Sequence, residues 1–428
     1  MRRLSGIRGD INCVFFGDHF YRDMRTLTFA GLAAVASPLA LIAGPSRAWA
    51  AEAVDALAAV RKAAESGAAS AQLALGKAYE NGDGVARDPA QAAVWLRKAA
   101  DRGNAEAQYN LAWLSAQGEG VPKDEGQALS WYRKAATQGF APAQYNLGVM
   151  YRDGLGVARD PAQSMAWLRK AAEHGNSDSQ AKIGMTYYLG QGVSMDLKEA
   201  AVWYRKAAEQ GDAGAQNILA LMYFEGQGVP KDHKEAAAWF LKSAEQGNVS
   251  AQTRLGEIFI RGDGLHHDGR AAFVWSRKAA EQGDAEAQYN TAQMCADGRG
   301  VARDYRAALG WYRKAAEQGD SNAQVNIGAM YMRGLAVGRD AKAGVDWYRK
   351  AAEKGNAEAQ YRLGESYEFA VGVKRDERAA LDWYRKAAGQ RYAPRGGKPG
   401  KLWLDALKRD SEGRPATAAY PGNPGSAR

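Results

Sequence analysis

The sequence predicts an all-α solenoid of nine helix-turn-helix repeats, each 36 residues long. Three observations lead to this fold class. A glutamine recurs with a strict period of 36, a tryptophan recurs with the same period in a second register, and the apolar residues between them follow helical spacing. The glutamines are Gln72, Gln108, Gln144, Gln180, Gln216, Gln252, Gln288, Gln324 and Gln360, and the tryptophans are Trp95, Trp131, Trp167, Trp203, Trp239, Trp275, Trp311, Trp347 and Trp383.

The first helix of each repeat has a recognisable start and end. In the second repeat Asn104 is placed to cap the helix, and Ala107 and Leu111 follow on one side at i, i+4 spacing. Two glycines then stand one residue apart, here Gly118 and Gly120. Glycine supplies the positive φ that a tight turn between two helices requires, so we expect the first helix to end there.

The second helix begins at an aspartate, which is Asp124 in the second repeat. Five repeats place Gln or Glu three residues later, which predicts a capping box in which each side chain bonds the other residue's backbone N–H. The five pairs are Asp88/Gln91, Asp124/Gln127, Asp160/Gln163, Asp196/Glu199 and Asp232/Glu235. Two repeats depart from the turn pattern, because Ala336 and Ala370 each replace a turn glycine.

These A-Q, G-x-G-V and W-Y-R-K-A-A segments at fixed spacing resemble the Sel-one-like repeat family, a relative of the tetratricopeptide repeats. The resemblance covers residues 68–391. It implies a right-handed α–α superhelix whose first helices line a concave face, used as an adaptor or scaffold. A cysteine-rich secreted branch of the family has been linked to β-lactam binding and hydrolysis. Paired cysteines are absent here, since the chain has 2 Cys in total, so that activity is not expected.

The N-terminal 50 residues predict export. Residues 26–43 form an uncharged apolar run, and Ala48-Trp49-Ala50 places small residues where a signal peptidase cuts. We expect residues 1–50 to be leader and signal peptide, with translation starting at Met24 and cleavage after Ala50. The mature protein is then periplasmic or secreted. An uncleaved N-terminal helix that anchors the chain is the alternative.

The other segments follow from the register of the repeats. Residues 51–67 align with half a repeat and are expected to cap the N-terminal end. Residues 68–391 hold the nine repeats, residues 392–410 predict a short C-terminal capping helix, and residues 411–428 a disordered tail. The two ends carry +3 and +5 of the +9 net charge, which leaves +1 on residues 51–388. A nucleic-acid partner is therefore not expected, although the basic tail could contact anionic envelope polymers.

No residue pattern predicts catalysis, a cofactor or a metal. The paired glycines follow helices rather than strands, so they indicate turns and not a phosphate site. Cys295 stands where most repeats have Tyr or Phe and is expected to be a buried, inert thiol, while His266 and His267 are expected in an exposed loop. We also expect Arg205, Arg277 and Arg313 to pair with the Glu four residues later.

The candidate site consists of first-helix positions that differ between repeats while staying aromatic or apolar. A helix positions such residues on one face at i, i+4, i+7 spacing. The predicted groove residues are Tyr109, Trp113, Tyr145, Val149, Met185, Tyr188, Leu221, Phe224 and Ile260. The alternative is that these side chains pack against the neighbouring repeat.

Together these patterns predict an exported, non-enzymatic scaffold that binds a protein or peptide partner of the cell envelope along its concave groove. A cell-wall-linked enzyme or β-lactam binder is one alternative, and a polysaccharide-assembly scaffold that stacks sugars on the aromatic residues is another. The identity of the partner and the oligomeric state do not follow from the sequence.

Overall fold

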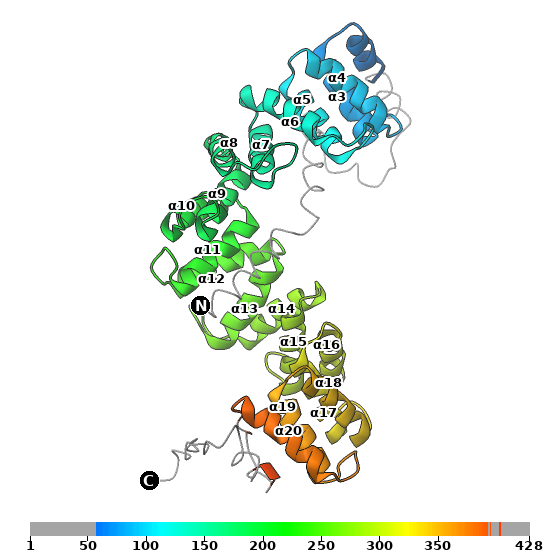
Figure 1. Cartoon of the computed structure of the whole chain (residues 1–428), viewed down its shortest axis with the longest axis vertical. Helices are drawn as coiled ribbons and strands as arrows, with labels where there is room; N and C mark the ends of the chain where they lie inside the picture. The colour runs from blue at the N-terminus through cyan, green and yellow to red at the C-terminus, as the bar shows by residue number, and fades with distance from the viewer. Residues whose placement is uncertain (1–56, 393, 395–401, 404–428) are drawn as a thin grey trace, which may run out of the picture. The chain divides into compact units, whose positions relative to one another are not determined.

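The computed structural model describes residues 57–392, 394 and 402–403, and all regular structure in these residues is helical. Figure 1 shows the helices following one another along the chain. A helical segment over residues 57–65 precedes them. The first nine are α3 (Ala69–Asn81), α4 (Pro89–Asp101), α5 (Ala105–Gln117), α6 (Glu125–Thr137), α7 (Ala141–Asp153), α8 (Pro161–Glu173), α9 (Ser177–Leu189), α10 (Leu197–Glu209) and α11 (Ala213–Glu225). The second nine are α12 (His233–Glu245), α13 (Val249–Arg261), α14 (Gly269–Glu281), α15 (Ala285–Asp297), α16 (Tyr305–Glu317), α17 (Ser321–Arg333), α18 (Ala341–Glu353), α19 (Ala357–Glu368) and α20 (Glu377–Gly389).

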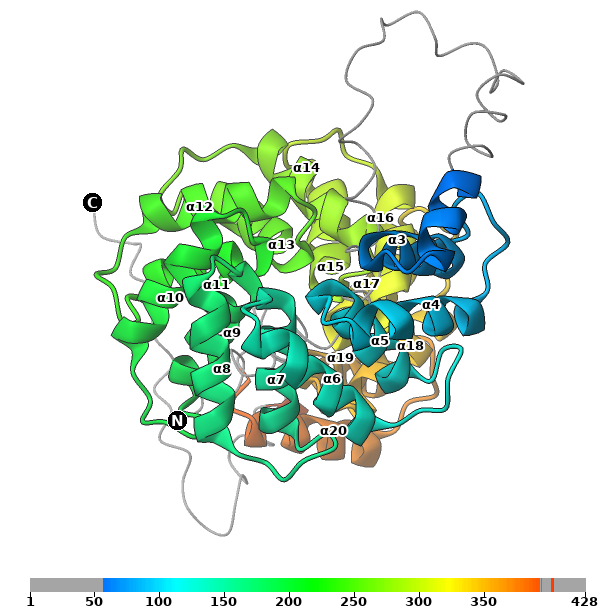
Figure 2. The same ribbon diagram turned by 90° about the horizontal axis from the view of Figure 1, so that it is seen from above.

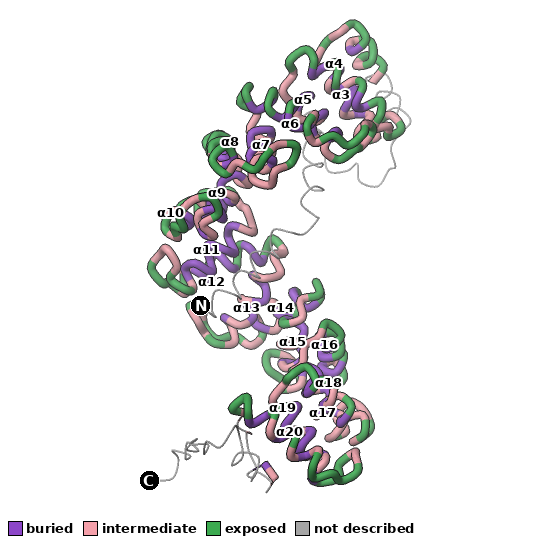
Figure 3. The backbone as a smooth tube through the Cα atoms, viewed as in Figure 1, coloured by how far each residue is buried: buried purple, intermediate pink, exposed green. Residues whose placement is uncertain are grey.

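Each odd-numbered helix and the helix after it form one repeat, so the predicted all-α solenoid of nine helix pairs is confirmed. The chain divides into two compact units, Met1–Ser243 and Ala244–Arg428. Within each unit the buried residues lie between the paired helices, and the turns are exposed, as Figure 3 shows. Leu96, Leu111 and Leu147 belong to one core cluster of the first unit, and Ile327 belongs to one of the second.

The predicted side-chain caps form, but the reciprocal bond of the capping box does not. Asn104 Oδ1 accepts a hydrogen bond from Ala107 N at 2.8 Å, and Asp124 Oδ1 accepts one from Gln127 N at 2.8 Å. The reciprocal bond is precluded because the backbone N–H of Asp124 already donates to the carbonyl of Ser115 on the first helix. The same holds for Asp88, Asp160, Asp196 and Asp232. The expectation of full capping boxes is therefore wrong, since this N–H closes the turn instead.

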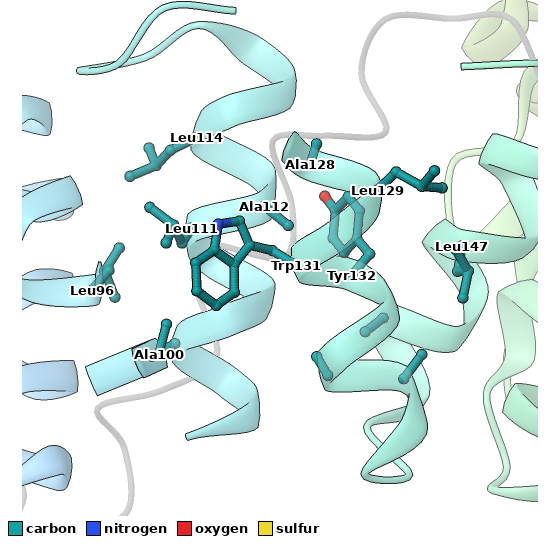
Figure 4. Packing of buried hydrophobic residues seen from close by; sticks show 14 of the residues in the cluster. Leu96, Ala100, Leu111, Ala112, Leu114, Ala128, Leu129, Trp131, Tyr132 and Leu147 are labelled. Atoms are coloured by element: carbon teal, nitrogen blue, oxygen red, sulfur yellow. The ribbon is translucent and has the colours of Figure 1, made fainter. Parts of the chain in front are cut away.

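The hairpin core is built around the residue that follows each tryptophan. Tyr204 is completely buried, and its ring lies on Gly184 of the first helix, where an added Cβ would come within 3.1 Å of the ring. Figure 4 shows the corresponding region of the second repeat, with Trp131 of α6 near Leu111 and Ala112 of α5. Small residues on the first helix therefore let the paired helix approach closely.

The C-terminal end of the described chain is closed by aromatic residues. Trp403 is buried, and its ring centroid lies 5.1 Å from that of Tyr361 and 5.6 Å from that of Tyr384. The rest of the predicted capping helix, the tail and residues 1–50 lie outside the described residues. None of the helices in the described part is long and apolar enough to cross a membrane.

Two turns are strained by alanine. Ala336 has φ 67° and Ala370 has φ 55°, whereas Gly300, at the position of Ala336 one repeat earlier, has φ 72°. A Cβ in the left-handed region costs about 1 kcal/mol. We expect Ala336→Gly to raise the free energy of unfolding of its repeat by about 1 kcal/mol, measured by urea unfolding. Ala343→Gly, on α18, should lower it by a similar amount, because a helix disfavours glycine. A loss of stability in Ala336→Gly would contradict the assigned strain.

Candidate functional site

The repeated glutamine joins three helices, a role that its period alone did not indicate. In all nine repeats its side-chain amide donates to the backbone carbonyl eight residues earlier, at the end of the preceding second helix, over 3.0–3.4 Å. In the second repeat Gln108 also accepts a hydrogen bond from Gln138 Nε2 at 2.8 Å. Gln108 therefore links α4, α5 and α6. The sequence signal for this role was that a polar residue recurs at one helix position, because a buried polar side chain needs a hydrogen-bond partner.

The tryptophans are used in a second repeated contact. The lysine three residues later places its Nζ over the indole ring in every repeat, at 3.8–4.4 Å from the centroid. This cation–π contact holds the lysine against the second helix of its own repeat. Most of the nine indoles are half-buried, and two of them, Trp131 and Trp239, are buried.

Several of the arginines that stand two residues after the tryptophans bridge to the next repeat. Arg133 donates to the hydroxyl of Tyr151, and Arg313 to that of Tyr331 at 2.9 Å, each on the next first helix. Arg205 likewise donates to the hydroxyl of Tyr223. Of the three predicted Arg–Glu pairs, Arg277–Glu281 is confirmed, with Nε and Oε1 2.7 Å apart. The prediction was wrong for Arg205 and Arg313, because a tyrosine hydroxyl of the next repeat reaches them instead.

The first helices lie on the inner side of the first unit. Figure 2 shows α7, α9 and α11 there, with α8 and α10 on the outer side. Eight of the nine predicted groove residues belong to this unit, and Ile260 belongs to the second. Six of the nine are half-buried: Tyr109, Trp113, Tyr145, Val149, Phe224 and Ile260. Met185, Tyr188 and Leu221 are buried, with 9%, 8% and 9% of their surface exposed.

The buried members are packing residues for a geometric reason. Tyr188 stands near the end of α9 and reaches the turn of the next hairpin. Tyr188 donates its hydroxyl to Gln227 Oε1 at 2.7 Å, and its ring meets that of Tyr204 edge-on. The ring of Phe224 stacks on His233 at 4.6 Å. These contacts leave Met185, Tyr188 and Leu221 little surface for a partner, while binding by the other six stays a prediction.

Charged residues interrupt the apolar face in the third and fourth repeats. Arg152, three residues after Val149, bonds Asp153 at 2.7 Å. The pKa of Lys182 on α9 is lowered to about 8, mainly by burial and also by the charge of Arg152, while Asp153 and Asp178 oppose this shift. Burial also raises the pKa of Asp178. The inner face of the first unit is therefore apolar with a charged centre, rather than apolar throughout.

The repeats match a known family over their full length. The Sel1 repeat model matches residues 69–104, 105–140, 141–176, 177–212, 213–248, 249–284, 285–320, 321–356 and 357–392. The chain belongs to the Sel1 repeat family. Sel1 repeat proteins are generally protein-interaction scaffolds, and this is the coarse function that membership supports.

Two solved Sel1 repeat structures are similar to the chain. One is c5321, a protective antigen of uropathogenic Escherichia coli with an SLR fold, at 43% identity and TM-score 0.72, covering 79% of this chain and 73% of that one. The other is a Sel1 repeat protein from Oxalobacter formigenes, at 33% identity and TM-score 0.53, covering 73% of this chain and 90% of that one. Among curated proteins, no relative matches.

The described residues of this Sel1 repeat protein hold no group of three or more His, Cys, Asp or Glu that could bind a metal. Cys295 is buried, and burial raises the pKa of its thiol, as expected for an inert cysteine. His266 and His267 are exposed, as predicted. A hollow of about 470 Å³ along α6 is lined by Gly126, Leu129, Ser130, Arg133, Lys134 and Thr137. These residues do not form an acid–base pair for catalysis.

Proposed function

We propose that this Sel1 repeat protein is an exported scaffold that binds a protein or peptide segment of the cell envelope along the first-helix face of its first unit. One observation carries the proposal. The residues that recur in each repeat are engaged in the same internal contacts, whereas the first-helix residues on the inner side differ from repeat to repeat. Residues with a fixed packing role cannot distinguish partners, so the varied ones supply specificity.

The composition of this face indicates the kind of partner. Tyr109, Trp113 and Tyr145 provide large, partly exposed aromatic surfaces, and Val149 adds an aliphatic one. Aromatic residues that are partly buried before binding lose little side-chain entropy when a partner covers them. Because charges follow at Arg152, we infer a segment with apolar anchors followed by a polar or charged residue.

Export is supported by two separate facts. The apolar run at residues 26–43 and the Ala48-Trp49-Ala50 segment fit a cleaved signal peptide. The similar protein c5321 is described as a protective antigen, a role that agrees with exposure outside the cytoplasm. We propose the periplasm or the exterior as the location of the mature protein.

Crosslinking in the native envelope, followed by mass spectrometry, tests the proposal. We expect one main partner to be captured by the full chain, and the chain's own N-terminal peptide to begin at Ala51. Val149→Lys should reduce capture roughly tenfold, because charging an apolar anchor costs about 1–2 kcal/mol of binding. The free energy of unfolding should change little, since Val149 is half-buried.

The matched control is Val202→Lys. Val202 lies on α10 on the outer side and is 49% exposed, so capture should be unchanged. Equal capture by the wild-type chain and Val149→Lys would contradict the assigned face. Retention of the purified protein by wall polymer alone, with no protein captured, would favour the polysaccharide alternative instead.

A further inference from the structure

Two positions of the repeat place side chains of neighbouring first helices opposite each other. One is the fifth residue after the repeated glutamine, and the other is the second residue before the glutamine of the next repeat. In the first and second repeats these residues are Lys77 and Glu106, whose Nζ and Oε1 atoms lie 2.8 Å apart. This contact shows that the register places the two side chains within hydrogen-bonding distance of each other.

In the sixth and seventh repeats, within the second unit, both positions hold glutamate. Glu257 stands on α13 and Glu286 on α15, and these two helices contact each other directly. The register that brings Lys77 to Glu106 places the two carboxyl groups opposite each other, and the charge of Glu257 favours the protonated form of Glu286. Two ionised carboxylates repel each other, whereas a carboxyl group that holds a proton can donate it to its neighbour.

The surrounding charges do not neutralise the pair. Arg254 Nη1 lies 3.1 Å from Glu257 Oε2, and the Glu257 side chain is only 18% exposed. Asp284, which caps α15 and bonds Thr253, adds a further negative charge. The charged side chains of the packed helices α14 and α16 are exposed: Arg270, Arg277, Lys278 and Glu281, and Arg306, Arg313, Lys314 and Glu317.

We propose that the Glu257–Glu286 contact is a pH-sensitive junction, which holds the sixth and seventh repeats together in mildly acidic surroundings and loosens as the pH rises past neutrality. Below neutrality one proton is shared, and the two carboxyl groups attract. Above it both are ionised and repel each other, and the single charge of Arg254 offsets only part of this repulsion. No other repeat junction has a glutamate at both of these positions.

The direction of the pH effect follows from the titration. Loss of solvent around the Glu286 carboxyl is the largest cause that raises its pKa, from 4.5 to about 7; Glu257 adds to this effect, and Arg254 opposes it. A glutamate in the unfolded chain releases its proton near the ordinary value. Between pH 4.5 and about 7 the folded chain therefore binds more protons than the unfolded chain. The contact stabilises the fold fully below pH 4.5, and this stabilisation is lost as the pH rises through about 7.

Hydrogen–deuterium exchange of the full chain tests this inference, read on peptides from α13 and α15 between pH 5.5 and 8.5 and corrected for intrinsic exchange. We expect the opening of these two helices to increase roughly tenfold across the range. This increase is smaller than the one that the full pKa change would give, because Glu286 keeps contact with solvent. Glu286→Gln has the same shape and does not titrate, so it should remove this pH dependence. Glu286→Lys should recreate the Lys77–Glu106 contact with reversed sign and keep the junction closed at high pH.

Glu106→Gln is the matched control at the same position in the first unit, and it should leave the pH response of α13 and α15 unchanged. An identical pH dependence in wild type and Glu286→Gln would overturn the proposal. If Glu286→Gln is unstable, Glu257→Gln replaces it: loss of the pH dependence of α13 and α15 supports the proposal, and an unchanged pH dependence overturns it. This inference is independent of partner capture, because the readout uses the isolated protein.

Discussion

Replacing Tyr204 by alanine is expected to lower the free energy of unfolding of the first unit by about 4 kcal/mol. The side chain is completely buried between α9 and α10, and its ring fills the space above Gly184. Removing a large buried ring loses its transfer free energy and leaves a cavity that fixed helices cannot close. Urea unfolding followed by circular dichroism measures the loss, and exchange of α9 and α10 should rise before that of α3.

Tyr204→Phe is the matched control. The hydroxyl of Tyr204 has no hydrogen-bond partner among the described residues, and the fifth repeat uses Phe240 at the same position. Losing this hydroxyl should leave stability unchanged or raise it by up to about 1 kcal/mol. Tyr384→Phe should instead be destabilising, because Tyr384 donates to the buried Glu368 carboxyl at 2.8 Å. If Tyr204→Phe cost as much as Tyr204→Ala, packing would not be the cause.

Replacing Gln288 by alanine is expected to cost about 2–3 kcal/mol. Its Nε2 donates to the carbonyl of Ala280 at 3.2 Å, and its Oε1 accepts from Gln318 Nε2 at 2.9 Å. The residue is buried, so its loss leaves two polar groups without their partner. Urea unfolding of the full chain checks the cost, with exchange of α14–α16 to locate it.

Gln324, one repeat later, provides the comparison. Its Nε2 donates to the Ala316 carbonyl at 3.4 Å, but its Oε1 has no partner among the described residues, since Lys354 stands where six of the nine repeats have glutamine. Gln324→Ala should therefore cost about 1 kcal/mol less than Gln288→Ala. Equal costs would show that the glutamine-to-glutamine bond contributes nothing to stability.

Much of the fold could be predicted from the sequence because its signals are local. Asn104 and Asp124 mark the helix starts, and Gly118 marks the end of the first helix. What the sequence did not indicate depends on contacts with a neighbouring helix. The backbone N–H of Asp124 donates to the Ser115 carbonyl, and the Arg205 side chain donates to the Tyr223 hydroxyl. The rules for an isolated helix therefore predicted the wrong partner in both cases.

The candidate site was only partly predictable for a related reason. Spacing along one helix identifies a face, but it does not show how far the neighbouring hairpin covers that face. Val149 and Tyr188 belong to the same predicted groove, yet Val149 is half-buried and Tyr188 is buried with its hydroxyl bonded. The Glu257–Glu286 contact was likewise hidden, because its two residues stand 29 positions apart and meet only when two first helices are placed side by side.

The reach of the glutamine contact has a consequence for how such a chain can change in length. The side chain of Gln108 hydrogen-bonds the carbonyl of Ala100 and the amide of Gln138, so these two bonds are completed within the adjoining helices. Cutting out residues 105–140 would bring Gln144 to Ala100, an alanine carbonyl of the kind that Gln144 already meets at Ala136. Whole repeats can therefore be added or removed while the same glutamine contact forms at the new junction. The number of repeats can then change in evolution to match the length of the bound partner.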